Sequence, residues 1–238
     1  TYFSTDIAYH YNKFFIRKYE RIINIFGADH HSHVFRIKSA LEAFEIVQNK
    51  MDTLLTQIVH FKSNNKSERF SKRAGNIYTI RDLLDVVGVD AIRFNFLHRT
   101  PESQQEFDID LAIKESSENP VYYIQYAYAR LSSIINSVEF DYSKANLNLL
   151  QTKFETSLIE TLDLFPEVVA RSASTLQTHL ITKYSLDLAR QLQIFYENCR
   201  VLSEDIELTK ARVNLVISSK IVLKNVLNLL GINTPERM

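Results

Sequence analysis

The stretch that decides the fold is Glu118-Asn119-Pro120-Val121-Tyr122-Tyr123-Ile124-Gln125-Tyr126-Ala127-Tyr128-Ala129-Arg130, because the sequence changes character within it. From Pro120 onward, apolar residues recur at the spacing of an α-helix. One face of this helix, spanning about 80°, carries Val121, Ile124, Tyr128, Leu131 and Ile135. The pattern predicts a helix that packs through this face.

The opposite face of the same helix carries Tyr122, Tyr123, Tyr126 and Arg130. Aromatic rings beside a cation suit stacking on nucleic-acid bases or neutralising a phosphate. Packing against the preceding half of the chain explains the same residues, and we favour that interpretation.

The rest of the chain predicts a bundle of about five helices. Further helical stretches cover residues 147–164, 166–179 and 186–202. The last helix has its apolar face at Val213, Val216, Ile217, Leu223, Leu227 and Leu230. Gly231 can end this helix in the left-handed conformation.

Before residue 118 the pattern is α/β, because short β-rich runs alternate with amphipathic stretches. One run, residues 22–26, predicts a strand that ends at Gly27, and residues 54–61 are again strand-like. The helix expected between them has one face made of Val34, Ile37, Leu41 and Phe44.

Composition restricts the functions that the chain can have. Its 238 residues carry 28 Lys and Arg against 28 Asp and Glu, so no bulk charge indicates nucleic acid or a membrane surface. Only four residues are Gly, which leaves little room for glycine-rich phosphate loops, and the single Cys199 supplies neither a disulfide nor a cysteine-based zinc site.

Without a signal peptide or an apolar run of about 20 residues, we expect a cytoplasmic protein and no membrane partner. The chain begins at Thr1 within a patterned segment, so we expect residues upstream of it.

Residues 62–73 are the most strongly charged segment, with a net charge of +4. The segment is polar and lacks periodicity, which predicts a mobile loop that extends to Asn76. Such a loop can close over a polyphosphate and stabilise charge on a leaving pyrophosphate. On composition alone, a solvated surface loop is the more frequent explanation. Helix signals resume at Thr79 and Asp82, which have the spacing of a capping box.

The motif Arg69-Phe70-Ser71-Lys72-Arg73-Ala74-Gly75-Asn76, followed by Gly88-Val89-Asp90-Ala91-Ile92-Arg93-Phe94, resembles the KMSKS loop and downstream helices of class I aminoacyl-tRNA synthetases. Within that class the resemblance is strongest to arginyl-tRNA synthetases. It implies that Lys72, assisted by Arg69, stabilises the phosphates of ATP, and that Ser71 also binds ATP. Arg69, Phe70 and Arg73 replace the usual Lys, Met and final Ser of the motif.

The opening segment Thr1-Tyr2-Phe3-Ser4-Thr5-Asp6-Ile7-Ala8-Tyr9-His10 resembles the arginine-recognising segment of the same family. Tyr2 and Asp6 lie one turn apart on one helical face. A carboxylate can hold a guanidinium through two parallel hydrogen bonds. The resemblance therefore implies that Tyr2 and Asp6 bind arginine. The alternative is a packed Tyr2, with Asp6 in the first turn of the helix, where the dipole favours it.

The cluster Gly27-Ala28-Asp29-His30-His31-Ser32-His33 follows the first predicted strand, where ligands bind in α/β sheets. It resembles the GADHH stretch of the family. The resemblance implies that Gly27 lets adenosine approach closely and that Asp29 and His30 contact the nucleoside or the arginyl group, with His31 and His33 as supports. A transition-metal site is the alternative. We predict no bound metal, because consecutive residues in a turn rarely converge on one ion.

Residues 107–112 and 118–130 resemble the family's passage from the catalytic fold into the helical anticodon-binding domain. Asp108 and Asp110 suggest a paired-carboxylate site, but residues two apart do not share a helical face. We therefore expect them to cap a helix.

The sequence Asp187-Leu188-Ala189-Arg190 occupies the place of the Asp-Ala-Leu-Arg motif that names this anticodon-binding fold, with the middle residues reversed. Near the end of the same helix, Tyr196, Asn198 and Arg200 offer stacking, an amide edge and a cation. These residues are candidate anticodon contacts, and a helix-end cap is the alternative.

The resemblance implies a mostly α-helical chain in three parts. Residues 1–76 are the carboxyl half of a Rossmann-like catalytic α/β fold and contain the loop 69–73. Residues 77–118 form a helical region that connects this fold to the bundle. Residues 119–238 form the anticodon-binding bundle. It implies an arginine–tRNA ligase that uses ATP with Mg²⁺ and acts on arginine and tRNA(Arg), as a monomer.

The HIGH motif of the family is absent, so we expect a carboxyl-terminal fragment that is inactive by itself. Two alternatives remain. One is a cysteinyl-type synthetase, whose zinc site Cys199 alone cannot supply, and the other is a non-catalytic RNA-binding module.

Overall fold

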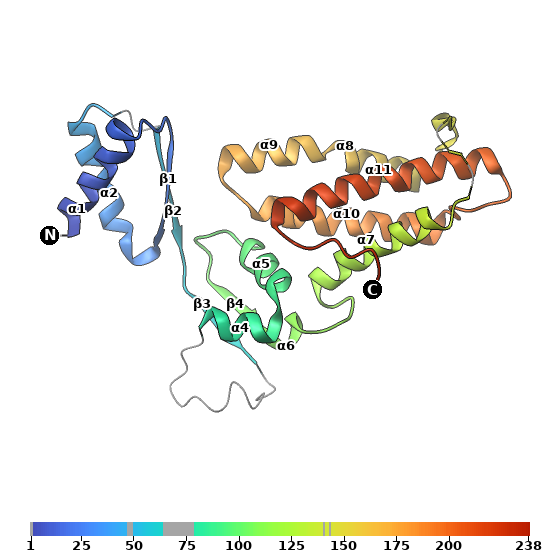
Figure 1. Cartoon of the computed structure of the whole chain (residues 1–238), viewed down its shortest axis with the longest axis horizontal. Coiled ribbons are helices and arrows are strands. Elements are labelled where there is room, and N and C mark those ends of the chain that lie inside the picture. Colours follow the sequence, from blue (N-terminus) through green and yellow to red (C-terminus); the bar gives the residue numbers. More distant parts are fainter. Residues whose placement is uncertain (1, 47–49, 64–78, 140, 143) are drawn as a thin grey trace. The chain divides into compact units, whose positions relative to one another are not determined.

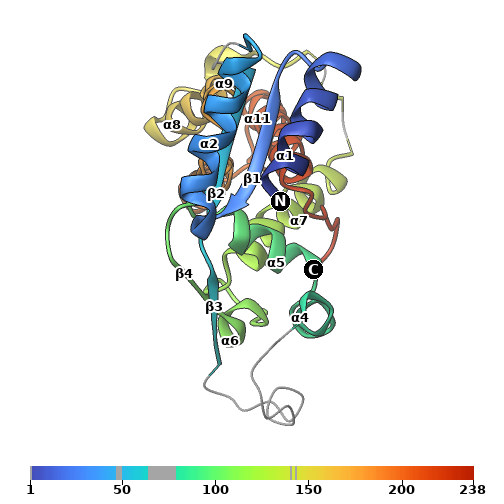
Figure 2. The same ribbon diagram turned by 90° about the vertical axis from the view of Figure 1, so that its left-hand side faces the viewer.

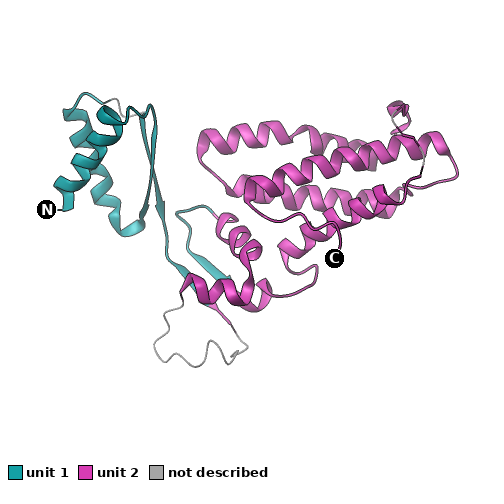
Figure 3. Cartoon of the chain, viewed as in Figure 1, with its two compact units in different colours: residues 1–61, 100–107 teal, residues 62–99, 108–238 magenta. Residues whose placement is uncertain are grey.

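The computed structural model describes residues 2–46, 50–63, 79–139, 141–142 and 144–238 (Figure 1). The chain forms two compact units, of which unit 1 comprises residues 1–61 and 100–107 and unit 2 comprises residues 62–99 and 108–238 (Figure 3). Most of the described chain is helical, with the α/β elements confined to its first part, which confirms the predicted fold class. The predicted boundaries after residues 76 and 118 stay predictions.

Unit 1 is built on two parallel strands, β1 (Ile22–Gly27) and β2 (Met51–Thr56), with Ile22 paired to Met51 and Gly27 to Thr56. Parallel strands require a crossover connection, and helix α2 (His31–Ala43) lies within it. Helix α1 (Tyr2–Tyr11), which continues into the π-helical turn Asn12–Ile16, lies with α2 on one face of the strand pair (Figures 1 and 2). The predicted strand at residues 22–26 and the helix after it are confirmed.

The predicted strand at residues 54–61 is wrong as a single element. The chain instead leaves β2 at Thr56 and forms a separate short strand, β3 (Val59–Lys62), which pairs with β4 (Gln105–Asp108). Between the two strands, the Gln57 N–H donates to the Pro101 carbonyl at 2.9 Å. The run 54–61 is interrupted by the polar residues Thr56 and Gln57, and the hydrogen-bonding partner of the chain changes there.

The core of unit 1 forms where α2 meets β2. Ile37, Leu41 and Met51 are buried, and Phe3, Phe14, Phe26 and Ile46 pack around them. Phe44 does not belong to this core, because α2 ends at Ala43 and the Phe44 side chain is 39% exposed. Strand β1 alternates as expected for one covered face, with Ile22 and Asn24 buried.

A buried polar network joins α1 to β1. His10 is 2% exposed; its Nδ1 donates to the Asp6 carbonyl at 2.7 Å, and its Nε2 accepts from the Asn24 amide at 2.8 Å. The Asn24 Oδ1 in turn accepts from the Lys13 ammonium at 3.2 Å. A neutral imidazole satisfies both of its partners here, whereas a second proton on Nε2 would face an amide N–H. Burial lowers the pKa of His10, and the nearby charge of Lys13 lowers it further.

Unit 2 contains three short helices, α4 (Ile80–Val87), α5 (Val89–Leu97) and α6 (Ile109–Ala112), ahead of a helical bundle. The bundle comprises α7 (Pro120–Asn136), α8 (Lys153–Asp163), α9 (Phe165–Thr175), α10 (His179–Asn198) and α11 (Ile206–Leu230). These five described helices confirm the predicted bundle. The boundaries differ, since residues 147–149 form a separate 3₁₀ turn and α10 begins at His179 rather than near residue 186.

The start signals of these helices form as the sequence predicts. Thr79 and Asp82 make the reciprocal hydrogen bonds of a capping box at the start of α4. The Asp108 carboxylate accepts from the Leu111 N–H at 2.9 Å, so this residue caps α6. The interpretation of Asp108 as a cap is confirmed.

Helix α11 is the longest described helix of the bundle. Val213, Val216, Leu223 and Leu227 are fully buried, and the helix packs against α7, α8, α10 and α5. By length and composition alone α11 is apolar enough to cross a membrane. Its packing in the bundle accounts for the same apolar residues.

Gly231 ends α11 in the left-handed conformation, with φ +66°. Arg93 from α5 donates through Nε to the Leu230 carbonyl at 3.0 Å, and a Cβ on Gly231 would lie 2.6 Å from the Arg93 guanidinium. Glycine is therefore favoured here both by its backbone conformation and by the close approach of Arg93.

A buried ion pair ties three parts of the bundle together. Glu155 is fully buried, and its carboxylate accepts from Arg212 Nε and from the Thr152 N–H, at 2.7 and 2.8 Å. Arg212 also donates to the Arg200 carbonyl at 2.8 Å. Burial raises the pKa of the Glu155 carboxyl, but hydrogen bonds from Arg212 and Thr152 lower it by more, so the net pKa lies below its ordinary value.

We predict that Glu155→Gln lowers the free energy of unfolding by about 3 kcal/mol, because it leaves the buried Arg212 charge uncompensated. Urea unfolding followed by far-ultraviolet circular dichroism measures the change. The exposed pair Glu207–Lys210 supplies the control, and Glu207→Gln should change stability by less than about 0.5 kcal/mol. Equal effects of the two substitutions would contradict a special role for the buried pair. The double variant Glu155→Leu with Arg212→Met should recover most of the loss.

We also predict that His10 makes the protein less stable as the pH falls. Its pKa is lower in the folded than in the unfolded protein, so the unfolded chain binds more protons as the pH drops through about 6.5. The contribution of His10 is therefore complete above that pH and is lost below it. Urea titrations at several pH values should show a weaker pH dependence in His10→Gln than in the parent chain. His60→Gln, an exposed histidine on β3, should leave the dependence unchanged.

Candidate functional site

The turn after β1 carries the predicted nucleotide-side residues. Strand β1 ends at Gly27, residues 28–30 form a 3₁₀ turn, and α2 begins at His31. The side chains of Asp29 and His30 are 84% and 54% exposed, with 3.8 Å between Asp29 Oδ2 and His30 Nε2. A Cβ on Gly27 would lie 2.5 Å from Asp29 Oδ1, so glycine lets this carboxylate fold back over the backbone.

The predicted arginine-side residues lie on α1. Tyr2 extends into solvent, 94% exposed, and Asp6 is beyond the first turn of the helix. The alternative of a packed Tyr2 and an Asp6 in the first turn is therefore wrong. The Asp6 side chain is 39% exposed, and its Oδ2 accepts from His33 Nε2 at 2.7 Å.

His33 connects the two groups of residues. Its ring lies 5.9 Å from the ring of His30, centroid to centroid, while its Nε2 contacts the Asp6 carboxylate. Asp6, His33, His30 and Asp29 thus form a continuous row of polar side chains from α1 to the turn after β1. The sequence interpretation treated His33 only as a support, because a separation of 27 positions from Asp6 leaves no local signal of their contact.

The predicted phosphate-binding residues Arg69, Ser71 and Lys72 lie outside the described part of the chain. Across residues 2–46, 50–63, 79–139, 141–142 and 144–238, no group of three or more His, Cys, Asp and Glu side chains is arranged to hold a metal ion. The row from Asp6 to Asp29 presents partly exposed hydrogen-bond donors and acceptors.

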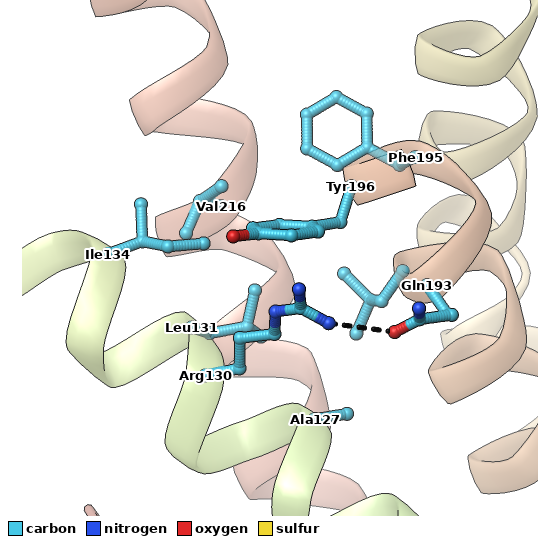
Figure 4. A pocket seen from close by; sticks show the side chains of 9 residues that line it. Ala127, Arg130, Leu131, Ile134, Gln193, Phe195, Tyr196 and Val216 are labelled. Atoms are coloured by element: carbon cyan, nitrogen blue, oxygen red, sulfur yellow. Dashed lines mark hydrogen bonds between the residues drawn. The ribbon is translucent and has the colours of Figure 1, made fainter. Parts of the chain in front are cut away.

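A second candidate site lies between α7 and α10. The Arg130 guanidinium lies 3.4 Å from the centroid of the Tyr196 ring, and its Nη1 donates to Gln193 Oε1 at 3.0 Å (Figure 4). These groups border a small pocket with a volume of about 20 Å³, which is room for about one water molecule. Its other lining residues are Ala127, Leu131, Ile134, Leu192, Phe195 and Val216. The Tyr196 side chain is 40% exposed beside an apolar wall and a cation.

The other two candidate contacts from this helix do not line the pocket. Asn198 turns its amide back onto the Ile194 carbonyl at 2.8 Å, as in the helix-end alternative. The main chain of Arg200 accepts the hydrogen bond from Arg212, and the residue is exposed. The structure therefore brings Tyr196 together with Arg130 rather than with Asn198 and Arg200.

The tyrosine face of α7 divides between two environments. The Tyr123 hydroxyl donates to the Ala189 carbonyl of α10 at 3.5 Å, and burial raises the pKa of this hydroxyl. Tyr122 and Tyr126 stack with their ring planes 9° apart, and Tyr126 is 44% exposed. Packing against the preceding half of the chain is thus the wrong explanation for Tyr123 and Arg130, whose partners lie on α10. These partners are more than 60 residues away in the sequence, so no spacing rule identifies them.

Comparison with known proteins shows which proteins the chain resembles. Residues 124–238 match the model of the DALR anticodon binding domain. Over 100% of its length the chain is 47% identical to the arginine–tRNA ligase of Dehalococcoides mccartyi and 45% identical to that of Acetivibrio thermocellus. The chain spans 43% of the length of each of these relatives.

Solved structures give the same result for the fold. A Campylobacter jejuni protein, provisionally named an arginyl-tRNA synthetase, superimposes over 100% of this chain and 52% of its own, with a TM-score of 0.89 and 30% identity. The arginyl-tRNA synthetase of Thermus thermophilus, 24% identical, shares the fold with a TM-score of 0.81 over 100% of this chain and 49% of its own. The chain is therefore similar over its whole length to part of the arginyl-tRNA synthetases, and residues 124–238 match the DALR anticodon binding domain.

Proposed function

We propose that this chain is part of an arginine–tRNA ligase and supplies the arginine-binding side of its active site together with its tRNA-binding bundle. One observation carries the proposal. In a chain that matches arginine–tRNA ligases throughout its length, the Asp6 carboxylate is held partly exposed beside the turn that contains Asp29 and His30. A fixed, accessible carboxylate is the group that binds a guanidinium in two-point geometry.

The proposed reaction has two steps. The arginine carboxylate attacks the α-phosphorus of ATP, which enters with Mg²⁺ as part of the substrate, and pyrophosphate leaves. A hydroxyl of the terminal ribose of tRNA(Arg) then attacks the arginyl carbonyl of the adenylate, and AMP leaves. In the first step Lys72, assisted by Arg69 and Ser71, stabilises the charge that develops on the phosphates. Tyr2 and Asp6 hold the arginine side chain, and Gly27, Asp29 and His30 line the nucleotide side.

The helical bundle is proposed to bind the tRNA. Tyr196 is the leading contact of the predicted set, because its ring is partly exposed in a pocket that Arg130 also borders. Asn198 and Arg200 follow at the end of the same helix. We further propose that the protein works in the cytoplasm and as a monomer, without a tightly bound metal or organic cofactor.

We predict that Lys72→Ala in the full-length protein reduces arginine-dependent ATP–pyrophosphate exchange by about 100-fold or more, the scale of a lost transition-state contact. The dissociation constant for tRNA(Arg) should change less than about threefold, because this contact forms with ATP. Exchange is measured with tRNA(Arg) present throughout.

The control for this experiment is Lys66→Ala, in the same basic segment of the sequence but outside the motif, which should cost much less activity. Equal losses in both variants would show a general effect of the charge of this segment. A full-length protein that binds tRNA(Arg) but never catalyses exchange would contradict the ligase and support a non-catalytic RNA-binding module.

We predict that Tyr196→Ala weakens tRNA(Arg) binding by about tenfold, the scale of one base–aromatic stacking contact. Tyr196→Phe keeps the ring and should bind tRNA(Arg) within about twofold of the parent protein. A filter-binding or fluorescence titration at constant salt measures both variants. Unchanged binding in Tyr196→Ala would show that the ring only packs between α7 and α10.

A further inference from the structure

The contact between His33 and Asp6 orients the Asp6 carboxylate in addition to packing α2 against α1. Asp6 lies on α1 and His33 on α2, and His33 Nε2 lies 2.7 Å from Asp6 Oδ2. An ionised carboxylate only accepts hydrogen bonds, so the ring nitrogen must donate. A neutral imidazole that donates in this way orients the carboxylate without cancelling its negative charge.

The orientation of the His33 ring is itself fixed by three neighbouring rings. Phe3 meets it edge to face at 5.8 Å, Phe26 at 6.1 Å and His30 at 5.9 Å, measured between ring centroids. These neighbours come from α1, from β1 and from the turn that follows β1. The His33 side chain is 19% exposed, so this contact is largely shielded from water.

The main chain at Asp6 is held as well. The Asp6 carbonyl accepts from His10 Nδ1 at 2.7 Å, and the other ring nitrogen of His10 contacts Asn24 on β1. The Asp6 backbone is therefore held within α1 by His10, which itself contacts β1, and one carboxylate oxygen is held by His33 from α2. A carboxylate has about four acceptor positions, so Oδ1 and the remaining position on Oδ2 can still accept two parallel bonds from a guanidinium.

We propose that His33 is a positioning residue for arginine binding, one that holds the Asp6 carboxylate in the orientation that receives the guanidinium. The inference rests on the proposed function and deepens it, because it names the group that prepares the arginine subsite. A carboxylate fixed before binding loses less rotational freedom when the ligand arrives, and the contact therefore acts on arginine affinity.

The test compares two substitutions at His33 in the full-length protein. His33→Leu removes the hydrogen-bond donor and keeps a side chain of similar volume. His33→Gln places an amide N–H near the position of the His33 Nε2. His33→Leu should raise the dissociation constant of arginine, measured by calorimetry, and the KM for arginine by about tenfold. The kcat and the KM for ATP should change less than about threefold. His33→Gln should restore most of the arginine affinity.

Three outcomes would overturn the inference. Equal losses of arginine affinity in His33→Leu and His33→Gln would assign His33 to packing alone. Unchanged affinity in His33→Leu would show that Asp6 needs no partner. A fall in kcat with unchanged KM for arginine would place His33 in a later step.

A second arm separates this inference from the proposed function. In an Asp6→Asn background, His33→Leu should weaken arginine binding less than about twofold further, because the carboxylate that His33 orients is gone. A large further loss would contradict the positioning role. If the parent protein does not bind arginine, or if Asp6→Asn alone binds it normally, the proposed arginine site fails instead.

Discussion

The buried pair Glu155–Arg212 is the interaction on which the helical bundle depends. A fully buried carboxylate is tolerated only when both oxygens are hydrogen-bonded, and Arg212 and the Thr152 N–H meet that requirement. Arg212 also reaches the Arg200 carbonyl, so the start of α8, the turn after α10 and the first half of α11 have to close together. With α11 held there, its apolar face packs against α7 and α10, and Arg93 joins α5 to its end.

Polar groups in unit 1 form a different kind of network. Glu155 has both oxygens bonded and is withdrawn from water, which suits a structural role. Asp6 is anchored through one oxygen and through its backbone but remains 39% exposed, and Asp29 and His30 are more exposed still. A polar group that is held in place and still open to solvent can bind a ligand at small cost in ordering. This contrast supports placing the proposed arginine subsite on α1 beside the turn after β1.

Much of the candidate site could be predicted from the sequence, because its signals are local. Gly27, Asp29 and His30 directly follow a β-rich run, and Tyr2 and Asp6 have the i, i+4 spacing of one helical face. The contacts that complete the sites are not local. His33 reaches Asp6 across 27 residues and Arg130 reaches Gln193 across 63, so no period of a helix or strand relates the partners. The favoured interpretation of the α7 tyrosine face failed for Tyr123 and Arg130 for this reason, since their partners on α10 are defined only by the packing of the bundle.

The sequence by itself determined the helix signals and the order of elements. Thr79 with Asp82, Asp108, and Gly231 at the end of α11 all act through bonds to residues at most a few positions away or through their own backbone angles. Only the tertiary structure decided where β2 gives way to β3 and which partners Glu155 and Asp6 acquire. The physical reason is distance along the chain. Capping and amphipathic periodicity are complete within a few turns, whereas strand pairing and buried polar contacts join groups that meet only after the chain has folded.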